Sequence, residues 1–430
     1  MLLMRNRDFM LFLWLNDIDS EDLNVEIYRF ARVIFGMNCS PFLLNATLKH
    51  HVSEYYAEDA DLADALLAAL YVDEWTSGAD GESKAFELYH ETNAWFAVGS
   101  FKLRKWASNS KAVINKITRD GEEREGAKET DIALKEESYA KTTVGGLDEI
   151  DPVKKHNVLE LNWNLDSDMV IFKFNNISKL WKSLQPTKRS ILQIAGKLFD
   201  PLGLISPVMV LLRMFLQDLC AKKYELDSIS SQPSAKLFQK WLDDAEKVDH
   251  IAIRHQYFST VTKKVSSASL HGFADASNGA YYAVVYLCAE TEDGYTTSLL
   301  TSKSRVAPLT PMTTPRLELI AALILVSLIS TVKEALSPVI NIEKIFCWTD
   351  NITVYYWMQL NRQYKQFVQN RIDEILKLTD ANNWRHCAGD NNPADIGCRG
   401  CLQSDLVNNA LWWNGSIWLK ESPQHCPISE

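Results

Sequence analysis

The stretch SLHGFADASNGAYYAVVYLCAE, residues 269–290, decides how the C-terminal half of this chain folds. Its apolar residues form two predicted strands that are separated at Asn278-Gly279, a dipeptide typical of tight turns between antiparallel strands. Asp275 lies in the middle of the first strand, where the alternation of side chains would otherwise require a neutral residue. A buried carboxylate is costly without a compensating cation, so the stretch predicts a β-hairpin that carries a functional acid.

The residues that follow predict the rest of an α/β unit. A third strand is expected over 296–307 and a long helix over 313–336, with Thr314 as its N-cap and Pro315 at its first position. A strand over 342–350 then ends in a carboxylate, and two helices and a short last strand complete the unit. This order of strands and helices is typical of a layered α/β domain.

The sequence upstream of this unit is more varied. Residues 22–70 are predicted to be helical, whereas residues 120–150 are charged and poor in large apolar groups, which indicates a linker or a surface excursion. A hairpin is expected over 158–174. Two helices should follow it, separated by the turn sequence Asp200-Pro201-Leu202-Gly203.

Length and composition limit the class of protein. A chain of 430 residues suggests roughly two to four domains, and a hydrophobic share of 47% is enough for real cores. Eight scattered cysteines without a secretory signal favour free thiols in the cytoplasm or the nucleus rather than secretion. The longest apolar run, residues 319–330, is expected to be too short to span a membrane. A net charge of −10 argues against nonspecific coating of nucleic acid, but not against an enzyme that acts on it.

Four carboxylates occur where the predicted α/β unit can bring them together. Asp275 is in the first strand, and Glu318 is one turn into the apolar helix. Asp350 ends the strand FCWTD, at the edge where such sheets place ligands, and Asp395 follows GDNNPA. Converging carboxylates imply divalent cations, and oxygen ligands select Mg²⁺ or Mn²⁺. Two such ions roughly 3.5–4 Å apart suit the hydrolysis of a phosphodiester bond.

The motifs FADAS, PRLEL, WTDN and NPADIGCRG resemble, in this order, the ribonuclease H domain of BEL/Pao long-terminal-repeat retrotransposon Pol polyproteins. LFDPLGLISPVMVLLRMFLQDL is similar to the segment that joins polymerase to ribonuclease H in that family. Further upstream, FLWLN, RVIFGMNCSPFLLNATLKHHV, YVDEWTSGAD and FKLRKWASN resemble successive parts of its reverse transcriptase.

The resemblance implies an α/β (α+β) chain that is a fragment of such a polyprotein. Its expected parts are a partial reverse transcriptase of late fingers and palm (1–107), a charged linker or thumb remnant (108–157), a connection segment (158–262), a ribonuclease-H-like domain with a mixed five-stranded sheet and flanking helices (263–405), and a C-terminal tail (406–430). The family is also named a Pao retrotransposon peptidase. No aspartic peptidase activity is predicted here, because the sequence contains neither Asp-Ser-Gly nor Asp-Thr-Gly.

The resemblance also assigns site residues. Cleavage of the RNA strand in an RNA–DNA hybrid would use two Mg²⁺ or Mn²⁺ ions, and the ligands of these ions are expected to be Asp275, Glu318, Asp350 and Asp395. His386 is expected to assist product release or proton transfer, with an ordinary hydrogen-bonded surface histidine as an equal alternative. Arg316 and Asn351, each next to a ligand, are predicted to contact the hybrid.

The polymerase part is predicted to be incomplete and inactive. Asp73 matches the first acid of a reverse-transcriptase hairpin, but Glu74 replaces the second, which moves the carboxylate by more than ~1 Å in a site that tolerates about 0.5 Å. The family's earlier aspartate is expected upstream of RDFMLFLWLN, where this chain starts. The segment LRKWASN suits contact with nucleic acid, or packing of its tryptophan in a core, and the predicted contacts are Lys102, Arg104, Lys105 and Trp106.

Several alternatives stay open. The spacing of Cys398 and Cys401, with Cys387 and His386 nearby, is compatible with a zinc site, but unpaired thiols are favoured because the family usually has serine at position 398. The chain is either an enzyme, with the hybrid and other retroelement polyprotein products as partners, or a silent relic or host-adopted module that binds nucleic acid or protein. An integrase is less favoured, because its glutamate would come last, on a terminal helix.

Overall fold

The structure is a computed structural model of the 430-residue chain, in which two compact units are distinguished. It describes residues 11–15, 25–30, 33–34, 36–55, 60–71, 74–124, 155–158, 161–174, 177, 187–228, 232–257, 265, 267–292, 294–360, 362–421 and 426–427. The first unit comprises residues 1–159 with 165–167, and the second comprises 160–164 with 168–430. From residue 168 on, the predicted connection segment, ribonuclease-H-like domain and C-terminal tail therefore share one unit.

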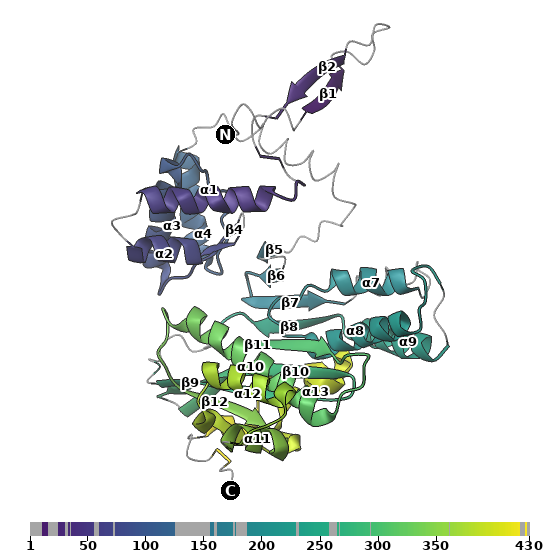
Figure 1. Cartoon of the computed structure of the whole chain (residues 1–430). Helices are drawn as coiled ribbons and strands as arrows, with labels where there is room; N and C mark the ends of the chain where they lie inside the picture. The colour runs from purple at the N-terminus through teal and green to yellow at the C-terminus, as the bar shows by residue number, and fades with distance from the viewer. Residues whose placement is uncertain are drawn as a thin grey trace. The chain divides into compact units, whose positions relative to one another are not determined.

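Short strands and helices make up the described part of the first unit. In chain order they are β1 (Leu11–Leu15), β2 (Val25–Arg29), α1 (Ser40–Tyr55), α2 (Ala60–Ala68), β3 (Leu70–Tyr71), β4 (Glu74–Trp75), α3 (Glu82–Val98), α4 (Lys111–Arg124) and β5 (Lys155–Val158) (Figure 1). The prediction of helix over 22–70 is wrong at its start. Val25 and Ile27 stand two residues apart, which is the period of a strand, and they pair with Leu15 and Leu13 of β1.

The second unit begins with the predicted hairpin and helices of the connection segment. Its elements are β6 (Leu161–Asn164), β7 (Met169–Lys173), α7 (Lys188–Lys197), α8 (Ser206–Ala221), α9 (Gln232–Lys247) and β8 (His250–Arg254). β7 pairs antiparallel with both β6 and β8. The turn between β6 and β7 contains Asp168 with φ +52, a left-handed conformation that aspartate tolerates better than most residues. The hairpin and the two helices predicted around residue 200 are thus confirmed.

A mixed five-stranded sheet, as predicted, is the centre of this unit. Its strands lie in the order β11–β10–β9–β12–β13, with β11, β10 and β9 antiparallel and β9, β12 and β13 parallel. The strands are β9 (Ser267–Ala276), β10 (Ala280–Thr291), β11 (Gly294–Val306), β12 (Ile342–Thr349) and β13 (Trp384–His386). The other elements are α10 (Thr314–Leu336), α11 (Ile352–Gln359), α12 (Gln366–Leu378), η2 (Ala381–Asn383), η3 (Gly389–Asn391), α13 (Pro393–Arg399), α14 (Gln403–Val407), α15 (Ala410–Asn414) and η4 (Ile417–Lys420).

Alternating residues of the sheet pack into two different cores. In β10, Ala283 and Val285 belong to a core that α10 and α12 share, whereas Tyr282 and Tyr286 belong to a core built from the connection segment and the C-terminal residues. Side chains of a strand point alternately to opposite faces, so the two sets of helices cover opposite faces of the sheet. α10 and α12 contact each other and lie next to one another in Figure 1.

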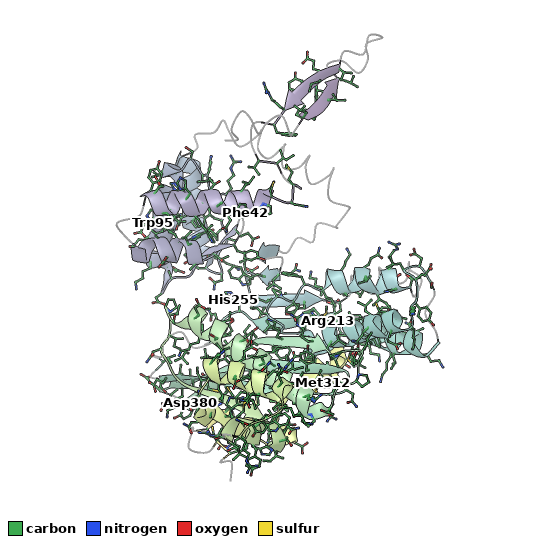
Figure 2. The ribbon with its side chains drawn as sticks, in the orientation of Figure 1. Phe42, Trp95, Arg213, His255, Met312 and Asp380 are labelled. Carbon is green, nitrogen blue, oxygen red and sulfur yellow. The ribbon has the colours of Figure 1, made fainter. Side chains whose placement is uncertain are left out.

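The connection segment and the C-terminal residues are bound to this sheet by polar contacts as well. The backbone N–H of Ser302 in β11 donates to the carbonyl of Leu202 at 2.9 Å. Arg213 of α8, labelled in Figure 2, donates from Nη1 to Ser304 Oγ of β11 at 2.8 Å. Trp412 Nε1 donates to the carbonyl of Leu204 at 3.0 Å, which joins the C-terminal residues to the connection segment. The connection segment therefore covers the sheet at its edge strand β11, whose backbone groups would otherwise be open to pairing with another chain.

Helix α10 differs from its prediction in two respects. Its N-cap is Thr313 rather than Thr314, with Pro315 in its first turn. With 23 residues and a hydropathy of 2.0 in its most apolar window, it is long and apolar enough to cross a membrane, although the apolar run was expected to be too short. Core helices of soluble proteins pass the same test. α10 packs on β9, β10 and α12, and these contacts explain its apolar composition.

Candidate metal centre

The register of the parallel strands brings two of the predicted acids together. Ala274 of β9 pairs with Thr349 of β12. Asp275 and Asp350 are the residues that follow this pair, so they lie side by side at the carboxyl ends of adjacent strands. Asp275 was expected in the middle of its strand but is its next-to-last residue. The sheet thus places both carboxylates at the edge where α/β folds bind ligands.

The other two acids come from helices that begin at the same edge. Glu318 is in the second turn of α10, and Asp395 is in the first turn of α13. Asn392 fixes the start of α13: its Oδ1 accepts from Ala394 N–H, and its Nδ2 donates to the carbonyl of Ala274, both at 3.1 Å. An N-cap asparagine that also bonds to β9 therefore attaches the Asp395 helix to the Asp275 strand.

These four carboxylates line one cleft. Its volume is about 370 Å³, and its lining also includes Ser277, Asn278, Thr314 and Arg399. The Arg399 Nε donates to Asp395 Oδ1 at 2.6 Å, which pairs one of these acids with a basic side chain. The four predicted ligands are thus brought together from two strands and two helices.

Burial and mutual repulsion disfavour the ionised form of the carboxylates in the cleft. Asp275 and Glu318 are only 5% and 7% exposed. Burial, and then the charge of Asp350, raise the pKa of Asp275 to about 7. Burial, and then the charges of Asp275 and Asp350, raise the pKa of Glu318 to about 8. Burial also raises the pKa of Asp350. A site in which several carboxylates are held together against these costs is a candidate functional site.

Two buried oxygens of the cleft have no hydrogen-bond partner in the described structure. They are Oε2 of Glu318 and Oδ1 of Asp350. A buried carboxylate oxygen without a donor is costly, and a cation is the partner that satisfies several such oxygens at once. The donor set of carboxylate oxygens fits hard divalent cations such as Mg²⁺ or Mn²⁺.

None of the three accessory residues that were predicted is among the residues that line this cleft. His386, at the end of β13, places Nε2 3.1 Å from the carbonyl oxygen of Asp350. Asn351 caps α11, because its Oδ1 accepts from the N–H groups of Thr353 and Val354. Arg316 stacks over the ring of Phe367 at 5.0 Å. Their roles toward a hybrid or in proton transfer stay predictions.

The structure brings in two residues that the sequence did not single out, Asn392 and Arg399, and it places Cys398, which the sequence suggested only as a zinc ligand, beside Asp275. Asn392 bridges two elements, Arg399 holds Asp395, and Cys398 donates from Sγ to Asp275 Oδ2 at 3.0 Å. The pattern Asn-Pro before a short helix signals an N-cap, so Asn392 had a recognisable role in secondary structure. The tertiary partners of the three side chains had no signal in the sequence.

The geometry does not support the zinc alternative that rests on the Cys398–Cys401 spacing. None of the eight cysteines forms a disulfide. Among the described residues, the group that could hold a metal joins Cys398 with Asp275 and Asp395, and it includes neither Cys401 nor Cys387. The short helix α13 directs the Cys398 thiol toward β9 instead.

The predicted polymerase remnant lies in the first unit. Glu74 of β4 pairs with Tyr71 of β3, which confirms the hairpin, whereas Asp73 lies outside the described residues. Trp106 is half-buried, with its ring 5.9 Å from Trp75 and 4.8 Å from Tyr89 in edge-on contacts, as in the packing alternative. The exposed basic residues of this segment are Lys102, Arg104 and Lys105. Contact of these residues with nucleic acid stays a prediction.

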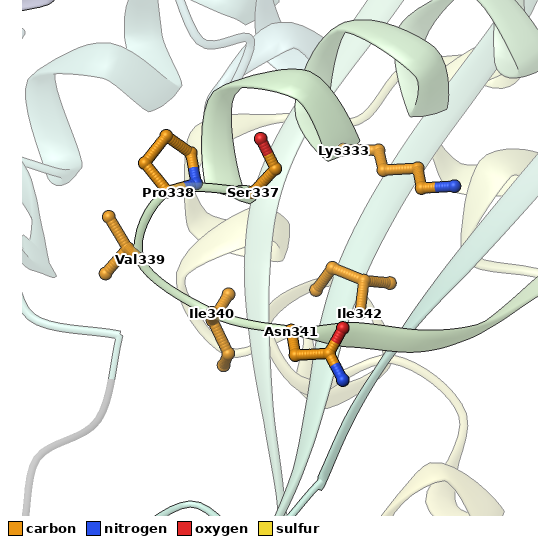
Figure 3. Close-up of a pocket in the computed structure, with 7 residues that line it drawn as sticks. All are labelled: Lys333, Ser337, Pro338, Val339, Ile340, Asn341 and Ile342. Carbon is orange, nitrogen blue, oxygen red and sulfur yellow. The ribbon is translucent and has the colours of Figure 1, made fainter. Parts of the chain in front are cut away.

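A second pocket, of about 320 Å³, lies at the C-terminal end of α10 (Figure 3). Its lining is formed by Lys333, Ser337, Pro338, Val339, Ile340, Asn341 and Ile342. It contains one charged side chain and no group of titratable residues. We therefore assign no chemistry to it.

A family model matches part of the chain. Residues 187–351 match the Pao retrotransposon-like RNaseH-like domain. This part of the chain is therefore similar to the Pao retrotransposon-like RNaseH-like domain. The match begins at the N-cap of α7 and ends just after Asp350, so it includes Asp275, Glu318 and Asp350 but not Asp395. It confirms the predicted resemblance to the BEL/Pao family in this range.

Solved structures similar to this chain include viral and cellular proteins. The foamy viral protease–reverse transcriptase in complex with double-stranded DNA is 12% identical, with a TM-score of 0.38 over 84% of this chain and 60% of that chain. RNase H1 from the halophilic archaeon Halobacterium salinarum NRC-1 is 13% identical, with a TM-score of 0.20 over 29% of this chain and 90% of that chain.

LC11-RNase H1 in complex with an RNA/DNA hybrid is 12% identical, with a TM-score of 0.22 over 30% of this chain and 91% of that chain. The chain covers less than two thirds of the foamy viral proteins that it resembles, with 37% and 60% of two of them. No curated protein matches the sequence.

Proposed function

We propose that the Pao retrotransposon RNase H-like domain cleaves the RNA strand of RNA–DNA hybrids with two Mg²⁺ or Mn²⁺ ions. The observation that carries the proposal is the convergence of Asp275, Glu318, Asp350 and Asp395 on one cleft, where buried oxygens of Glu318 and Asp350 have no hydrogen-bond partner among the described residues. The ions would supply an activated water and stabilise the leaving oxygen of the phosphodiester.

The protein's own residues would prepare this reaction. The β9–β12 register holds Asp275 and Asp350 side by side, and Asn392 holds the start of the Asp395 helix against β9. Arg399 neutralises one oxygen of Asp395 in the absence of ions. His386 lies beside the backbone of Asp350, from where it could hold a proton during product release.

The test uses the purified chain with labelled RNA–DNA hybrid, duplex DNA and single-stranded RNA in Mg²⁺ or Mn²⁺. The wild-type chain should cut the RNA of the hybrid, and Asp350→Asn should lower the rate more than about 100-fold, because loss of a metal ligand exceeds the usual effect of the residues that orient ligands. Asp390→Asn, an exposed acid of the neighbouring loop, is the matched control and should keep the rate. Cleavage that survives in Asp350→Asn contradicts the proposal.

The same experiment also tests the alternative, a catalytically silent module that only binds nucleic acid or protein. A metal-dependent rise of the melting temperature without cleavage of any substrate would favour a relic or a host-adopted module. We also propose that the reverse-transcriptase part is inactive, because Glu74 stands where that family has an aspartate. Primer extension on an RNA template should therefore give no product.

A further inference from the structure

The cleft contains one ligand type that a magnesium site does not need. The Cys398 side chain is 1% exposed, and its thiol is 3.0 Å from Asp275 Oδ2. Asp275, Asp395 and Cys398 each offer one ligand atom, and these three atoms lie within 4.8 Å of one another. Hard cations such as Mg²⁺ prefer oxygen, whereas thiolate sulfur selects borderline and soft cations.

A second observation at the same place calls for a cation. Glu318 lines the same cleft, is 7% exposed, and its Oε2 has no hydrogen-bond partner among the described residues. Glu318 is not part of the close group of Asp275, Asp395 and Cys398, but its buried carboxylate lines the same cleft and adds negative charge that favours a cation there. Three or four protein ligands of mixed oxygen and sulfur are a donor set that zinc accepts.

We propose that Asp275, Asp395 and Cys398 form a mixed oxygen–sulfur site that binds one Zn²⁺ or Cd²⁺ ion in competition with Mg²⁺, with water as the fourth ligand. This inference rests on the proposed function only in that both use the same carboxylates. It predicts a property of the chain that an all-oxygen site would lack, namely high affinity for thiophilic cations.

The ligand geometry requires little movement. Two ligands of a tetrahedral zinc ion, with bonds of about 2.0 and 2.3 Å, lie roughly 3.5 Å apart. The Cys398 sulfur and Asp275 Oδ2 are already 3.0 Å apart. Arg399 bonds to Oδ1 of Asp395, so we assign Oδ2 to the metal.

Binding changes one proton on Cys398. In the metal-free chain the neutral thiol donates its hydrogen to Asp275. The ion replaces that proton, which leaves to solvent, and bonds form from the metal to the thiolate sulfur and to the carboxylate oxygen. No oxidant or reductant is involved. Because Asp275 and Asp395 would then no longer be available to Mg²⁺, Zn²⁺ should inhibit any magnesium-dependent activity of the cleft.

The test titrates Cd²⁺ into the full chain, in a background where the exposed Cys39 and Cys220 are replaced by serine. A cadmium–thiolate bond gives a charge-transfer absorption in the ultraviolet that oxygen ligands do not give. We expect this absorption to saturate at one ion per chain. Cys398→Ser should abolish it and weaken Cd²⁺ binding at least about 10-fold. Cys401→Ser, whose thiol is not part of the group, is the matched control and should keep the absorption.

Serine at position 398 keeps a donor for Asp275, and a thermal melt verifies that the variant is folded. If it is not folded, ¹¹³Cd NMR of the unsubstituted protein decides, because a sulfur ligand shifts the resonance strongly downfield of an all-oxygen site. Absorption that is missing in the background protein, or that is unchanged in Cys398→Ser, overturns the inference.

Cleavage of the hybrid in Mg²⁺, measured on the same protein, shows whether the mixed site and the proposed nuclease activity hold or fail independently. Thiolate absorption without cleavage supports the mixed site and contradicts the nuclease. Cleavage without thiolate absorption supports the nuclease and contradicts the mixed site.

Discussion

At the scale of single residues, His271 shows how burial sets a protonation state. It lies in β9, stacked with Phe346 and Trp348, and Trp348 Nε1 donates to His271 Nδ1 at 3.3 Å. Burial lowers the pKa of His271 to about 3. The ring is therefore neutral in the folded protein at every pH above this value, and its Nδ1 is an acceptor.

This protonation state predicts an acid-dependent loss of stability. The ordinary pKa of histidine is 6.5, so between pH 6.5 and about 3 the unfolded chain binds a proton that the folded chain does not. Above pH 6.5 the buried His271 does not reduce the free energy of unfolding. Between pH 6.5 and about 3 this free energy falls by about 1.4 kcal/mol per pH unit. His271→Gln should flatten this slope in urea unfolding followed by circular dichroism, whereas the exposed His250→Gln should not. Equal slopes in all three proteins contradict the prediction.

The sequence was informative about the acids of the site and uninformative about their supports. Asp275, Glu318, Asp350 and Asp395 stand out because charge is unexpected in apolar strands and helices. Arg399 looks ordinary in the sequence, and Cys398 was noted only for its spacing to Cys401, because the importance of both residues depends on which side chains lie opposite them.

At the scale of elements, the turn between α7 and α8 shows a close contact between two segments that are far apart in sequence. Gly203 has φ +73, and a Cβ there would lie 2.2 Å from the carbonyl oxygen of Ser302. Asp200 stabilises the same turn, because its carboxylate accepts from the N–H groups of Leu204 and Ile205, the two residues before α8. Position 203 therefore requires glycine, both for its left-handed backbone and for its close contact with Ser302.

Gly203→Ala should destabilise the second unit by more than about 2 kcal/mol, through left-handed strain and the clash with β11. Gly196→Ala, in α7 with no atom within 4 Å of the added Cβ, is the matched control and should be neutral or stabilising by up to about 1 kcal/mol. Urea unfolding of the two variants measures both effects. A destabilisation by Gly203→Ala that is no larger than that of the control would show that the turn does not press on β11.

Helices and strands with a clear periodic pattern of apolar residues could be predicted from the sequence. Strands whose form depends on pairing with another strand could not. The apolar helix α10 and the strands β9 to β12 follow from their patterns, to within about one residue at the start of α10. β2 was predicted as helix, because five residues carry too little pattern and its partner β1 decides its form.

At the scale of the whole molecule, the second unit has a core that extends from the connection segment to the C-terminal residues. Ile191 and Trp241 of the connection segment share this core with Phe273 of the sheet and Trp412 near the C-terminus. Tyr286 OH also donates to the carbonyl of Trp412 at 2.7 Å. The family match likewise begins in the connection segment, at residue 187.

A fragment of residues 160–430 should therefore fold with one cooperative transition, whereas residues 263–405 should not. The shorter fragment exposes the apolar face of the sheet that the connection segment and residues 406–421 cover. Thermal melts followed by near-ultraviolet circular dichroism and size-exclusion chromatography measure the difference. A monomeric, cooperatively melting 263–405 fragment would show that the sheet does not need these segments.

The sequence by itself determined the α/β character of the C-terminal half, its strand order along the chain and the four acids of the cleft. These features depend on local period and on charge where apolar residues are expected, and both can be seen in a linear sequence. Only the tertiary structure decided that the connection segment and the C-terminal residues belong to the same core, that Asn392 joins α13 to β9, and that a thiol lies against Asp275. Each of these depends on contacts between residues about 100 or more positions apart, and residue type alone does not encode such contacts.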